Sequence, residues 1–460
     1  MNAMAAQDPA PDAEALPYPS ATREPTADPT DSEIVAARDY LFLGVLAFLS
    51  VLNFIDRQLI VSFANFIKAD LSLTVTEFAL LTGLVFITFY SIAGLFAGAM
   101  ADIFHRPRLL AAALGLWSIL TAASGAARGF LTMAIPRMMI GVGESVCTPT
   151  SMSMLSDRFP SSRLGMATAV YYMGVPIGVG LSLLIVGYMG ERIGWRACFY
   201  LLGVIGVVFA ALLLFFMKDP PRRGQMGSAS QEERPRLRQI YKTLFRALAR
   251  SPALSLTIAG GTAMHFLFGA ASFDQLWFVA ERGFEKSEIA RITGWIAIPA
   301  GVAGNLIGGL GSDWWQKHTG QGRPLFLFWL SLLLYPIMIA FRLVEPGSAW
   351  FWIGLACLIL SVGSVYGPTM ATVQELVPGQ IRGTVIAFYI MCANVIGLGV
   401  GMLLGGVLID GLILRGLEEP YTKGILFMSF LSMVSLPCLF VAGRRFERDR
   451  ESLAQSTGEA

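Results

Sequence analysis

The chain has 460 residues, of which 55% are hydrophobic and only 14% are charged, and its formal net charge is +2 at pH 7. A soluble globular protein carries about 25% charged residues, so this composition excludes the soluble class and indicates a membrane protein. A net charge this close to zero gives no reason to expect a nucleic-acid partner.

Apolar segments long enough to cross a membrane follow one another after residue 37. Residues 1–37 are rich in Pro, Ala and Asp, which is typical of a disordered tail, and they lack the apolar core of a secretory signal. About 20 apolar residues suffice for one spanning helix. We predict an all-α membrane protein with twelve transmembrane helices, at 40–67, 78–101, 109–128, 131–156, 164–190, 194–217, 252–280, 289–312, 324–343, 349–374, 383–411 and 422–442.

The distribution of Lys and Arg predicts the orientation. With the N-terminus in the cytoplasm, the inner loops and tails hold most of the basic residues, as the positive-inside rule requires. We therefore expect both termini to be cytoplasmic. The preference for Arg over Lys and the absence of organelle signals favour a multi-pass protein of a bacterial inner membrane.

The longest connection, 218–251, divides the predicted spans into six-helix bundles at 38–217 and 252–443, with a cytoplasmic tail at 444–460. Within it, RPRLRQIYKTLFRALAR places its apolar residues on one helical face with basic residues around the rest. This pattern predicts an amphipathic helix on the inner leaflet; a solvated linker helix is the alternative.

Two sequence patterns occur once in each half. GAMADIFHRPR carries Gly98 and Asp102 ahead of a basic loop, and GLGSDWWQKH carries Gly309 and Asp313 ahead of another. A second set is repeated at offsets of 218 or 219: Pro149, Pro160, Arg163 and Gly165 match Pro368, Pro378, Arg382 and Gly383. Two patterns in the same order indicate duplicated halves, related as parallel repeats.

Four ionisable residues lie inside predicted spans: Asp56 and Arg57 in 40–67, and Arg137 and Glu144 in 131–156. A charge at bilayer depth costs at least ~2.5–3.5 kcal/mol, so it persists where it is paired, hydrated or functional. Seven residues of helix separate Arg137 from Glu144 by about 10 Å, so each needs a partner on another helix.

We predict that Arg57 neutralises Glu144 and Arg137 neutralises Asp56, or the crossed arrangement. Breaking such contacts changes the proton affinity of a carboxyl group, which suits proton coupling. Asp56 is the predicted main protonation switch and Glu144 the second carboxylate; the two arginines are charge partners that can also meet an anionic substrate group. The alternative is a static buried cluster. Because the second half shows no matching ionic pair, coupling is expected in the first.

Other polar groups are weaker candidates for a substrate cavity, since each could equally be a packing residue. They are Tyr90, Tyr171, His265, Tyr366, Tyr389 and Asn394. Asp274 and Glu281, near the outer end of 252–280, suggest an outer gate or plain solvation. The three histidines have no metal-ligand spacing and a Walker A sequence is absent, so we expect no metal, no cofactor and a proton gradient as the energy source.

The predicted spans, the long central connection and the Gly-x-x-x-Asp patterns resemble the major facilitator superfamily. The resemblance implies two pseudo-symmetric six-helix bundles and a cytoplasmic gate motif in which Asp102 and Asp313 pair with helix ends or with arginines such as Arg163 and Arg382. Ile103 and Trp314 stand where the family has a basic residue. The motif positions here are Gly98, Asp102, Arg106, Gly309 and Asp313.

A narrower resemblance, over 38–443, is to the spinster family of lipid transporters. It rests on NFIDRQLIV, RMMIGVGES and TMATVQELVPGQIRGTVIA. The resemblance implies an amphiphilic substrate such as a lysophospholipid or a sphingoid phosphate. Spans poor in Asn, Gln and Lys fit an amphiphile with an anionic head and an aliphatic tail.

We therefore expect a monomeric, proton-coupled secondary transporter of an amphiphilic lipid-like substrate, surrounded by membrane lipids and not an enzyme. A transporter of small organic anions or drugs is the first alternative, with the arginines as carboxylate clamps. A membrane-embedded acyltransferase would need a motif such as H-x-x-x-x-D, which the sequence lacks. A non-transporting sensor is the remaining alternative.

Overall fold

The computed structural model describes residues 37–221, 237–378 and 381–457, and its regular structure in these ranges is helical. Most of the predicted N-terminal tail and residues 222–236 of the central connection lie outside the described residues. The helices before the central connection are α1 (Ala37–Ser62), α2 (Ala64–Asp70), α3 (Val75–Thr82), α4 (Leu84–Ile103), α5 (Arg106–Gly125), α6 (Phe130–Ser145), α7 (Cys147–Arg158), α8 (Ser161–Tyr172) and α9 (Gly174–Phe216).

The remaining helices follow the central connection and include two π-helical stretches, η2 and η4. They are α10 (Leu237–Arg250), α11 (Pro252–Ala271), α12 (Asp274–Arg282), α13 (Lys286–Leu306), η2 (Ile307–Gly311), α14 (Ser312–Thr319), α15 (Arg323–Ala340), α16 (Ala349–Ser364), α17 (Tyr366–Glu375), α18 (Arg382–Met391), η4 (Cys392–Val400), α19 (Gly401–Leu414), α20 (Pro420–Ser432) and α21 (Ser435–Thr457).

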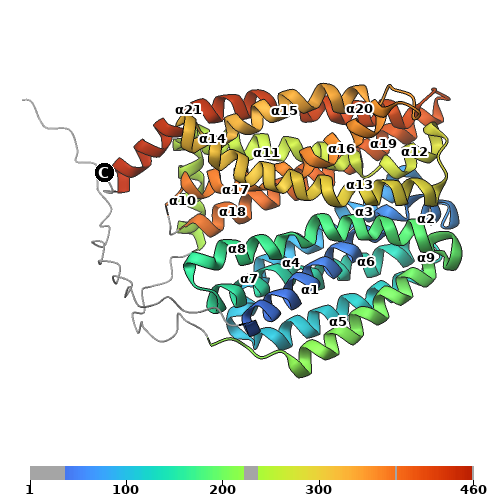
Figure 1. Cartoon of the computed structure of the whole chain (residues 1–460), viewed down its shortest axis with the longest axis horizontal. Helices are drawn as coiled ribbons and strands as arrows, with labels where there is room; N and C mark the ends of the chain where they lie inside the picture. The colour runs from blue at the N-terminus through green and yellow to red at the C-terminus, as the bar shows by residue number, and fades with distance from the viewer. Residues whose placement is uncertain (1–36, 222–236, 379–380, 458–460) are drawn as a thin grey trace, which may run out of the picture.

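The long helices run side by side in two groups (Figure 1). Most of the helices up to α9 form the first half, and the helices from α11 onward form the second. The start of α1, the helix α10 and the end of α21 lie at one end of the molecule, which we call the terminal end. The opposite end, where α2, α12 and the turn in α9 lie, is called the far end.

Eleven helical stretches in the described ranges are long and apolar enough to cross a membrane, which confirms a multi-pass, all-helical membrane protein. The stretch at 162–216 has 55 residues. Inside it, Gly194 has non-helical angles of φ 78° and ψ 160°. A positive φ is accessible to glycine at little cost, so the chain can reverse there within one residue. Figure 1 shows α9 turning back on itself at the far end.

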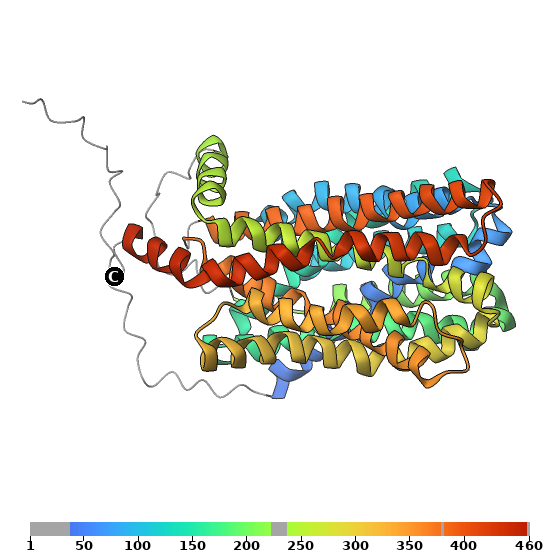
Figure 2. The same cartoon turned by 90° about the horizontal axis from the view of Figure 1, so that it is seen from above.

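The helix predicted within the central connection is present as α10, which crosses the long helices steeply at the terminal end (Figure 2). Leu244 of α10 is buried in an apolar cluster that includes Leu254 and Val385. The ring of Phe245 lies edge-on to that of Phe388, with centroids 6.4 Å apart. One face of α10 is thus packed onto the second half, at α11 and α18.

The two halves are joined at the far end. Asp410 of α19 accepts hydrogen bonds from the backbone amides of Val75 and Thr76, at 3.0 and 2.7 Å. Asn65 Nδ2 of α2 donates to the carbonyl of Gln275 on α12 at 2.6 Å. These bonds link the first half to the second at two places, so the far end is closed.

Glycines let α9 and α13 approach closely along the same interface. A Cβ added at Gly180 would lie 3.1 Å from the Gly294 carbonyl oxygen, and one at Gly294 would lie 2.9 Å from that of Gly180. Close helix contacts of this kind depend on small residues. By contrast, a Cβ at any of four glycines of the repeated patterns meets no atom within 4 Å: Gly98, Gly165, Gly309 and Gly383. The space into which a side chain at these four glycines would project is therefore free of neighbouring atoms.

Candidate functional site

Arg57 and Glu144 form an ion pair between α1 and α6. Arg57 Nε donates to a carboxylate oxygen of Glu144 at 3.0 Å. The Glu144 side chain is fully buried, whereas that of Arg57 is 25% exposed. The Arg57 guanidinium also lies 4.5 Å from the ring centroid of Tyr90, and both Phe54 and Phe86 lie within cation–π distance of it. The structure thus forms one of the two predicted pairs.

Asp56 points to another helix. Its two carboxylate oxygens lie 2.7 and 2.6 Å from the hydroxyl of Thr121 on α5, which can donate one hydrogen bond. The side chain is buried. Successive helix positions differ by about 100°, so neighbouring residues of α1 face different helices. Sequence reasoning missed Thr121, because a lone hydroxyl in an apolar span gives no charge signal.

Arg137 and Asp56 interact electrostatically, as predicted, but no ion pair within 4 Å joins them in the described structure. Arg137 Nη2 instead donates to the backbone carbonyl of Arg57 at 3.2 Å. Its guanidinium lies 4.6 Å from the ring centroid of Phe86. Arg137 is buried and its Nε has no hydrogen-bond partner. This cluster therefore combines the Arg57–Glu144 ion pair with the buried carboxyl group of Asp56 and the buried guanidinium of Arg137.

Tyr366 of the second half lies within electrostatic range of this cluster. It is 40% exposed and lies within electrostatic range of Arg57, Tyr90 and Tyr172. Its hydroxyl lies 3.0 Å from His265 Nε2, and His265 Nδ1 lies 2.7 Å from the Gly261 carbonyl. Since a carbonyl only accepts, Nδ1 carries the proton and Nε2 accepts from Tyr366. His265 itself is fully buried.

The other predicted cavity residues differ in position. Tyr171 is 1% exposed and donates to Thr148 at 3.3 Å, so it belongs to the core of the first half. The neighbouring Tyr172, which sequence reasoning missed, is 43% exposed. Tyr389 is buried beside His265, and Asn394 is half-buried on η4. Tyr90 thus contacts Arg57, Tyr366 lies within its electrostatic range, and Tyr172 lies within electrostatic range of both tyrosines.

The predicted gate motif forms contacts within each half. Arg106, at the start of α5, is buried and binds Asp219, at 2.7 Å, and Asp157. Arg323, at the start of α15, binds Asp313, at 2.8 Å, and Glu375. Asp157 and Glu375 are 218 residues apart, which matches the sequence repeat. The same clamp occurs in both halves.

The predicted partners of the motif aspartates are partly corrected. Asp313 pairs with Arg323 rather than with Arg382. Arg163 donates to the hydroxyl of Tyr40 at 2.7 Å. The side chain of Asp102 lies outside the described part of the structure.

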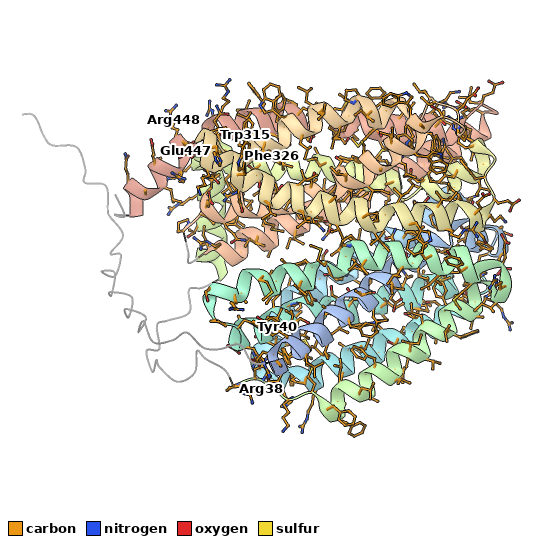
Figure 3. All side chains as sticks on the ribbon, in the orientation of Figure 1. Arg38, Tyr40, Trp315, Phe326, Glu447 and Arg448 are labelled. Atoms are coloured by element: carbon orange, nitrogen blue, oxygen red, sulfur yellow. The ribbon has the colours of Figure 1, made fainter. Side chains whose placement is uncertain are left out.

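Figure 3 places Arg38, Tyr40, Glu447 and Arg448, and also Trp315 with Phe326, toward the terminal end.

The expectation that the second half lacks a buried ionic pair is wrong. Arg342, just after α15, lies 2.7 Å from a carboxylate oxygen of Asp274 at the start of α12. Both side chains are buried, with exposed fractions of 2% and 9%. Arg342 lies at the edge of the predicted span 324–343, where water could have satisfied its charge, so its pairing was not predicted. Glu281 accepts hydrogen bonds from the backbone amides of Tyr421 and Thr422.

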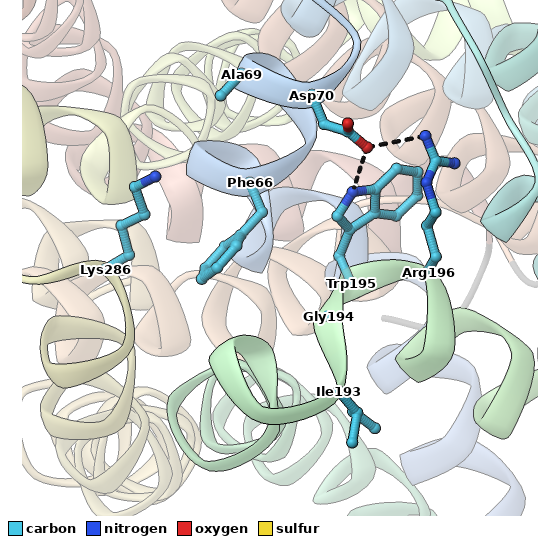
Figure 4. Close-up of a pocket in the computed structure, with 8 residues that line it drawn as sticks. All are labelled: Phe66, Ala69, Asp70, Ile193, Gly194, Trp195, Arg196 and Lys286. Carbon is cyan, nitrogen blue, oxygen red and sulfur yellow. Dashed lines mark hydrogen bonds and ion pairs between the residues drawn. The ribbon is translucent and has the colours of Figure 1, made fainter.

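A shallow pocket of about 530 Å³ opens at the far end, between α2, the turn in α9 and the start of α13 (Figure 4). Asp70 accepts hydrogen bonds there from Trp195 Nε1 at 2.9 Å and from Arg196 at 2.8 Å. Lys286 lies over the ring of Phe66, 5.4 Å from its centroid. In the described residues no three His, Cys, Asp or Glu side chains are grouped so that they could hold a metal ion.

A family model described as Major Facilitator Superfamily matches residues 46–402. The chain belongs to this superfamily. It is therefore a multi-pass integral membrane protein and a secondary transporter, and the superfamily's members are transporters rather than enzymes. The match covers both halves and both repeated motifs.

The chain is similar to several transporters of this superfamily. It is 27% identical to an MFS-type efflux pump of Mycolicibacterium smegmatis, over 90% of this chain and 94% of that protein. It is 26% identical to Protein spinster of Drosophila melanogaster, over 86% and 66%. A solved bacterial homologue of the human lysosomal transporter Spinster, inward-facing and unoccupied, is similar with a TM-score of 0.75 and 23% identity, over 90% and 98%.

Proposed function

We propose that the chain is a proton-coupled transporter that works by alternating access and moves an amphiphilic lipid-like substrate of the lysophospholipid or sphingoid phosphate class. The observation that carries this proposal is that the partly exposed Arg57 forms an ion pair with the buried Glu144, while the adjacent Asp56 is buried with no cation within ion-pair distance in the described structure. A buried carboxylate without a cation is costly when ionised, and protonation removes that cost.

The proposed topology has twelve passages, with both termini in the cytoplasm of a bacterium and bundles at 38–217 and 252–443. The reversal at Gly194 supports counting the stretch at 162–216 as two passages. Arg38 and Arg448 lie toward the terminal end, which supports a cytoplasmic terminal end by the positive-inside rule. In this orientation the motifs that contain Gly98 and Gly309 are cytoplasmic, and the hydrogen-bonded far end lies on the opposite side of the membrane.

Exchange of partners at Arg57 would couple substrate to protons. An anionic head group that binds the exposed side of Arg57 competes with Glu144 for the guanidinium. A released Glu144 is then a buried, unpaired carboxylate, which takes up a proton. Asp56 is the main protonation switch in this scheme and Glu144 the second carboxylate. Arg137, whose Nε has no partner, supplies a further cation to the same cluster.

The surroundings of Arg57 support an amphiphilic substrate. Phe54, Phe86 and Tyr90 surround the guanidinium. Tyr366 lies within electrostatic range of Arg57, and the partly exposed ring of Tyr172 lies within range of Tyr90 and Tyr366. A cationic anchor among apolar and aromatic groups suits an anionic head with an aliphatic tail. The similarity to the Sphingosine-1-phosphate transporter SPNS2 of Danio rerio, 24% identical over 88% of this chain and 82% of that protein, supports this class.

A transporter of small organic anions or drugs is the second candidate. The similarity to an MFS-type efflux pump, over nearly the whole of both chains, favours it. In that case Arg57 binds a carboxylate rather than a phosphate, and the aromatic side chains contact a compact ligand.

Transport by purified protein in liposomes with an imposed pH gradient tests the proposal. We expect uptake of a radiolabelled lysophospholipid that collapses with a protonophore, and its competition by unlabelled lysolipid but not by a sugar acid. The reverse competition would establish the organic-anion candidate. Asp56→Asn should bind the substrate but lose the response to the pH gradient; unchanged coupling in this variant would exclude Asp56 as the switch.

A further inference from the structure

Asp274 is the repeat counterpart of Asp56. The two residues are 218 positions apart, the offset that separates Pro160 from Pro378. The flanking sequences are FIDRQL around Asp56 and SFDQL around Asp274, and a Gln-Leu pair follows Asp56 after a one-residue gap and Asp274 directly. The duplication therefore places an aspartate at the same point in the first spanning segment of each half.

Both aspartates face the third spanning segment of their own half. Asp56 accepts from Thr121 on α5, and Asp274 lies 2.7 Å from Arg342, which follows α15. The helices α5 and α15 are themselves counterparts, since each begins with an Arg-Pro sequence. A buried carboxyl group facing this segment is thus built into both halves, and the partner differs.

The Asp274–Arg342 pair depends on the charge of Asp274. Arg342 is the charged group that faces Asp274, and the other charge near Arg342 is Arg282. Arg282 donates to the Arg342 carbonyl and pairs with Glu419. The Arg342 guanidinium lies against the ring of Trp277, and its Nη1 has no hydrogen-bond partner. Protonation of Asp274 would leave a buried guanidinium without an anion.

The pair also fixes the segment that closes the far end. Asp274 is the first residue of α12, directly after the break that ends α11. Interrupted spans of this kind mark ion sites in transporters. The carbonyl of the next residue, Gln275, accepts from Asn65 of the first half at 2.6 Å. Arg342 therefore holds α12 where it meets α2.

We propose that Asp274 is a proton-binding site that controls the far-end gate. The ionised carboxylate holds α12 through Arg342 and keeps the gate closed. A proton from the solution at the far end binds the carboxylate, the pair separates, and α12 moves away from Asn65. This proton returns to the same solution on closure, so it differs from a proton carried across with substrate at Asp56. The inference rests on the proposed alternating-access function.

The distance across the far end, measured against pH in the full chain, tests this assignment. Spin labels at Ala69 and Leu417, in a chain whose five cysteines are replaced by serine, would report the open and closed populations in nanodiscs. Over the pH range in which opening is coupled to the uptake of one proton, the open-to-closed ratio should rise about tenfold for each unit by which the pH falls. Asp274→Asn should be open at every pH, with no pH dependence.

Two matched variants separate the gate from coupling. Asp410→Asn weakens the other far-end contact, so it should shift the populations but keep the tenfold dependence. Asp56→Asn should lose coupled transport and keep the far-end response. If Asp274→Asn destabilises the fold, Asp274→Asn combined with Arg342→Gln removes both charges and should give a pH-independent population. A parent without pH dependence, or Asp274→Asn with the parental profile, would overturn the site and leave the transport proposal standing.

Discussion

Asp410 and Thr76 are bonded twice across the two halves: the Asp410 carboxylate accepts from the Thr76 amide at 2.7 Å and from its hydroxyl at 2.6 Å. The amide of Val75 donates to the second oxygen. The carboxylate thus satisfies free amides at the start of α3, a helix that belongs to the other half. This arrangement is a helix cap supplied across the interface, and it favours the closed far end.

Replacing Asp410 by Ala should open the far end. A lost cap typically costs about 0.5–2 kcal/mol, which would raise the open population several-fold. The measurement is the labelling rate of a cysteine placed at the buried Ala79, with a maleimide that cannot cross the membrane. Glu77→Ala is the control, because Glu77 completes a capping box within α3 itself. Equal labelling rates in the two variants would contradict the role of Asp410.

Arg57 should be required for stability as long as Glu144 is charged. Removing one member of a buried pair leaves an unpaired charge, so Arg57→Ala should lower the free energy of unfolding by about 3–5 kcal/mol. The Arg57→Met, Glu144→Leu double variant should recover most of that loss and still be unable to transport. Thermal unfolding in detergent and liposome uptake measure the two effects. A double variant no more stable than Arg57→Ala would argue against the pair.

Thr121 should stabilise the fold through its hydroxyl. Thr121→Val keeps the shape but leaves Asp56 without its donor, and an unsatisfied buried group costs about 1–3 kcal/mol. Thr121→Ser, which retains the hydroxyl, should cost less. The cost of Thr121→Val should disappear in the Asp56→Leu background, because no carboxylate then needs the bond. Unfolding measurements on these variants complete a double-mutant cycle.

Substitutions of Tyr171 and Tyr172 should distinguish a packing residue from a substrate-binding residue. Tyr172→Ala should weaken substrate binding, because its exposed ring lies within electrostatic range of Tyr90 and Tyr366, the tyrosines near Arg57. Tyr171→Phe removes a weak buried hydrogen bond, so it should change stability by about 1 kcal/mol and leave affinity as it is. Equilibrium binding of the transported lipid, alongside unfolding, distinguishes the two. If Tyr171→Phe weakened binding and Tyr172→Ala did not, Tyr171 rather than Tyr172 would be the residue that contacts the substrate.

Arg106 and Arg323 should differ in importance although they are counterparts. Arg106 is buried at 1% exposure, while Arg323 is at 13% and its partner Asp313 at 61%. Arg106→Ala would remove the cation bonded to Asp157 and Asp219, so the free energy of unfolding should fall by about 3–5 kcal/mol. Arg323→Ala should cost about 1 kcal/mol, as partly exposed pairs do. Unfolding of both variants under the same conditions checks the ranking.

The sequence predicted the features that depend on spacing. Apolar lengths located the spans, and the predicted break between 164–190 and 194–217 lies next to the reversal at Gly194. The repeated motifs singled out Arg106 and Asp313, whereas Arg323 and the bonded partners of Arg106 were not predicted. Partner choice depends on the rotation of each helix about its axis, which composition does not encode.

The site was predicted in part for the same reason. Arg57 and Glu144 could be paired because two opposite charges in neighbouring spans need each other. The direction of Asp56 could not be inferred, because it depends on a single hydroxyl of α5. Asp274 and Arg342 each lie near a span end, where water would satisfy a charge, so their mutual burial became visible with the packing of α12 against the residues after α15.

The reversal of α9 at Gly194 has a mechanical consequence. The two arms of this helix are connected through one residue rather than a loop, and Asp70 fastens the returning arm through Trp195 and Arg196. A displacement of residues 174–193 should therefore move residues 195–216 directly, because no loop separates the two arms. For the same reason we expect this turn to resist limited proteolysis.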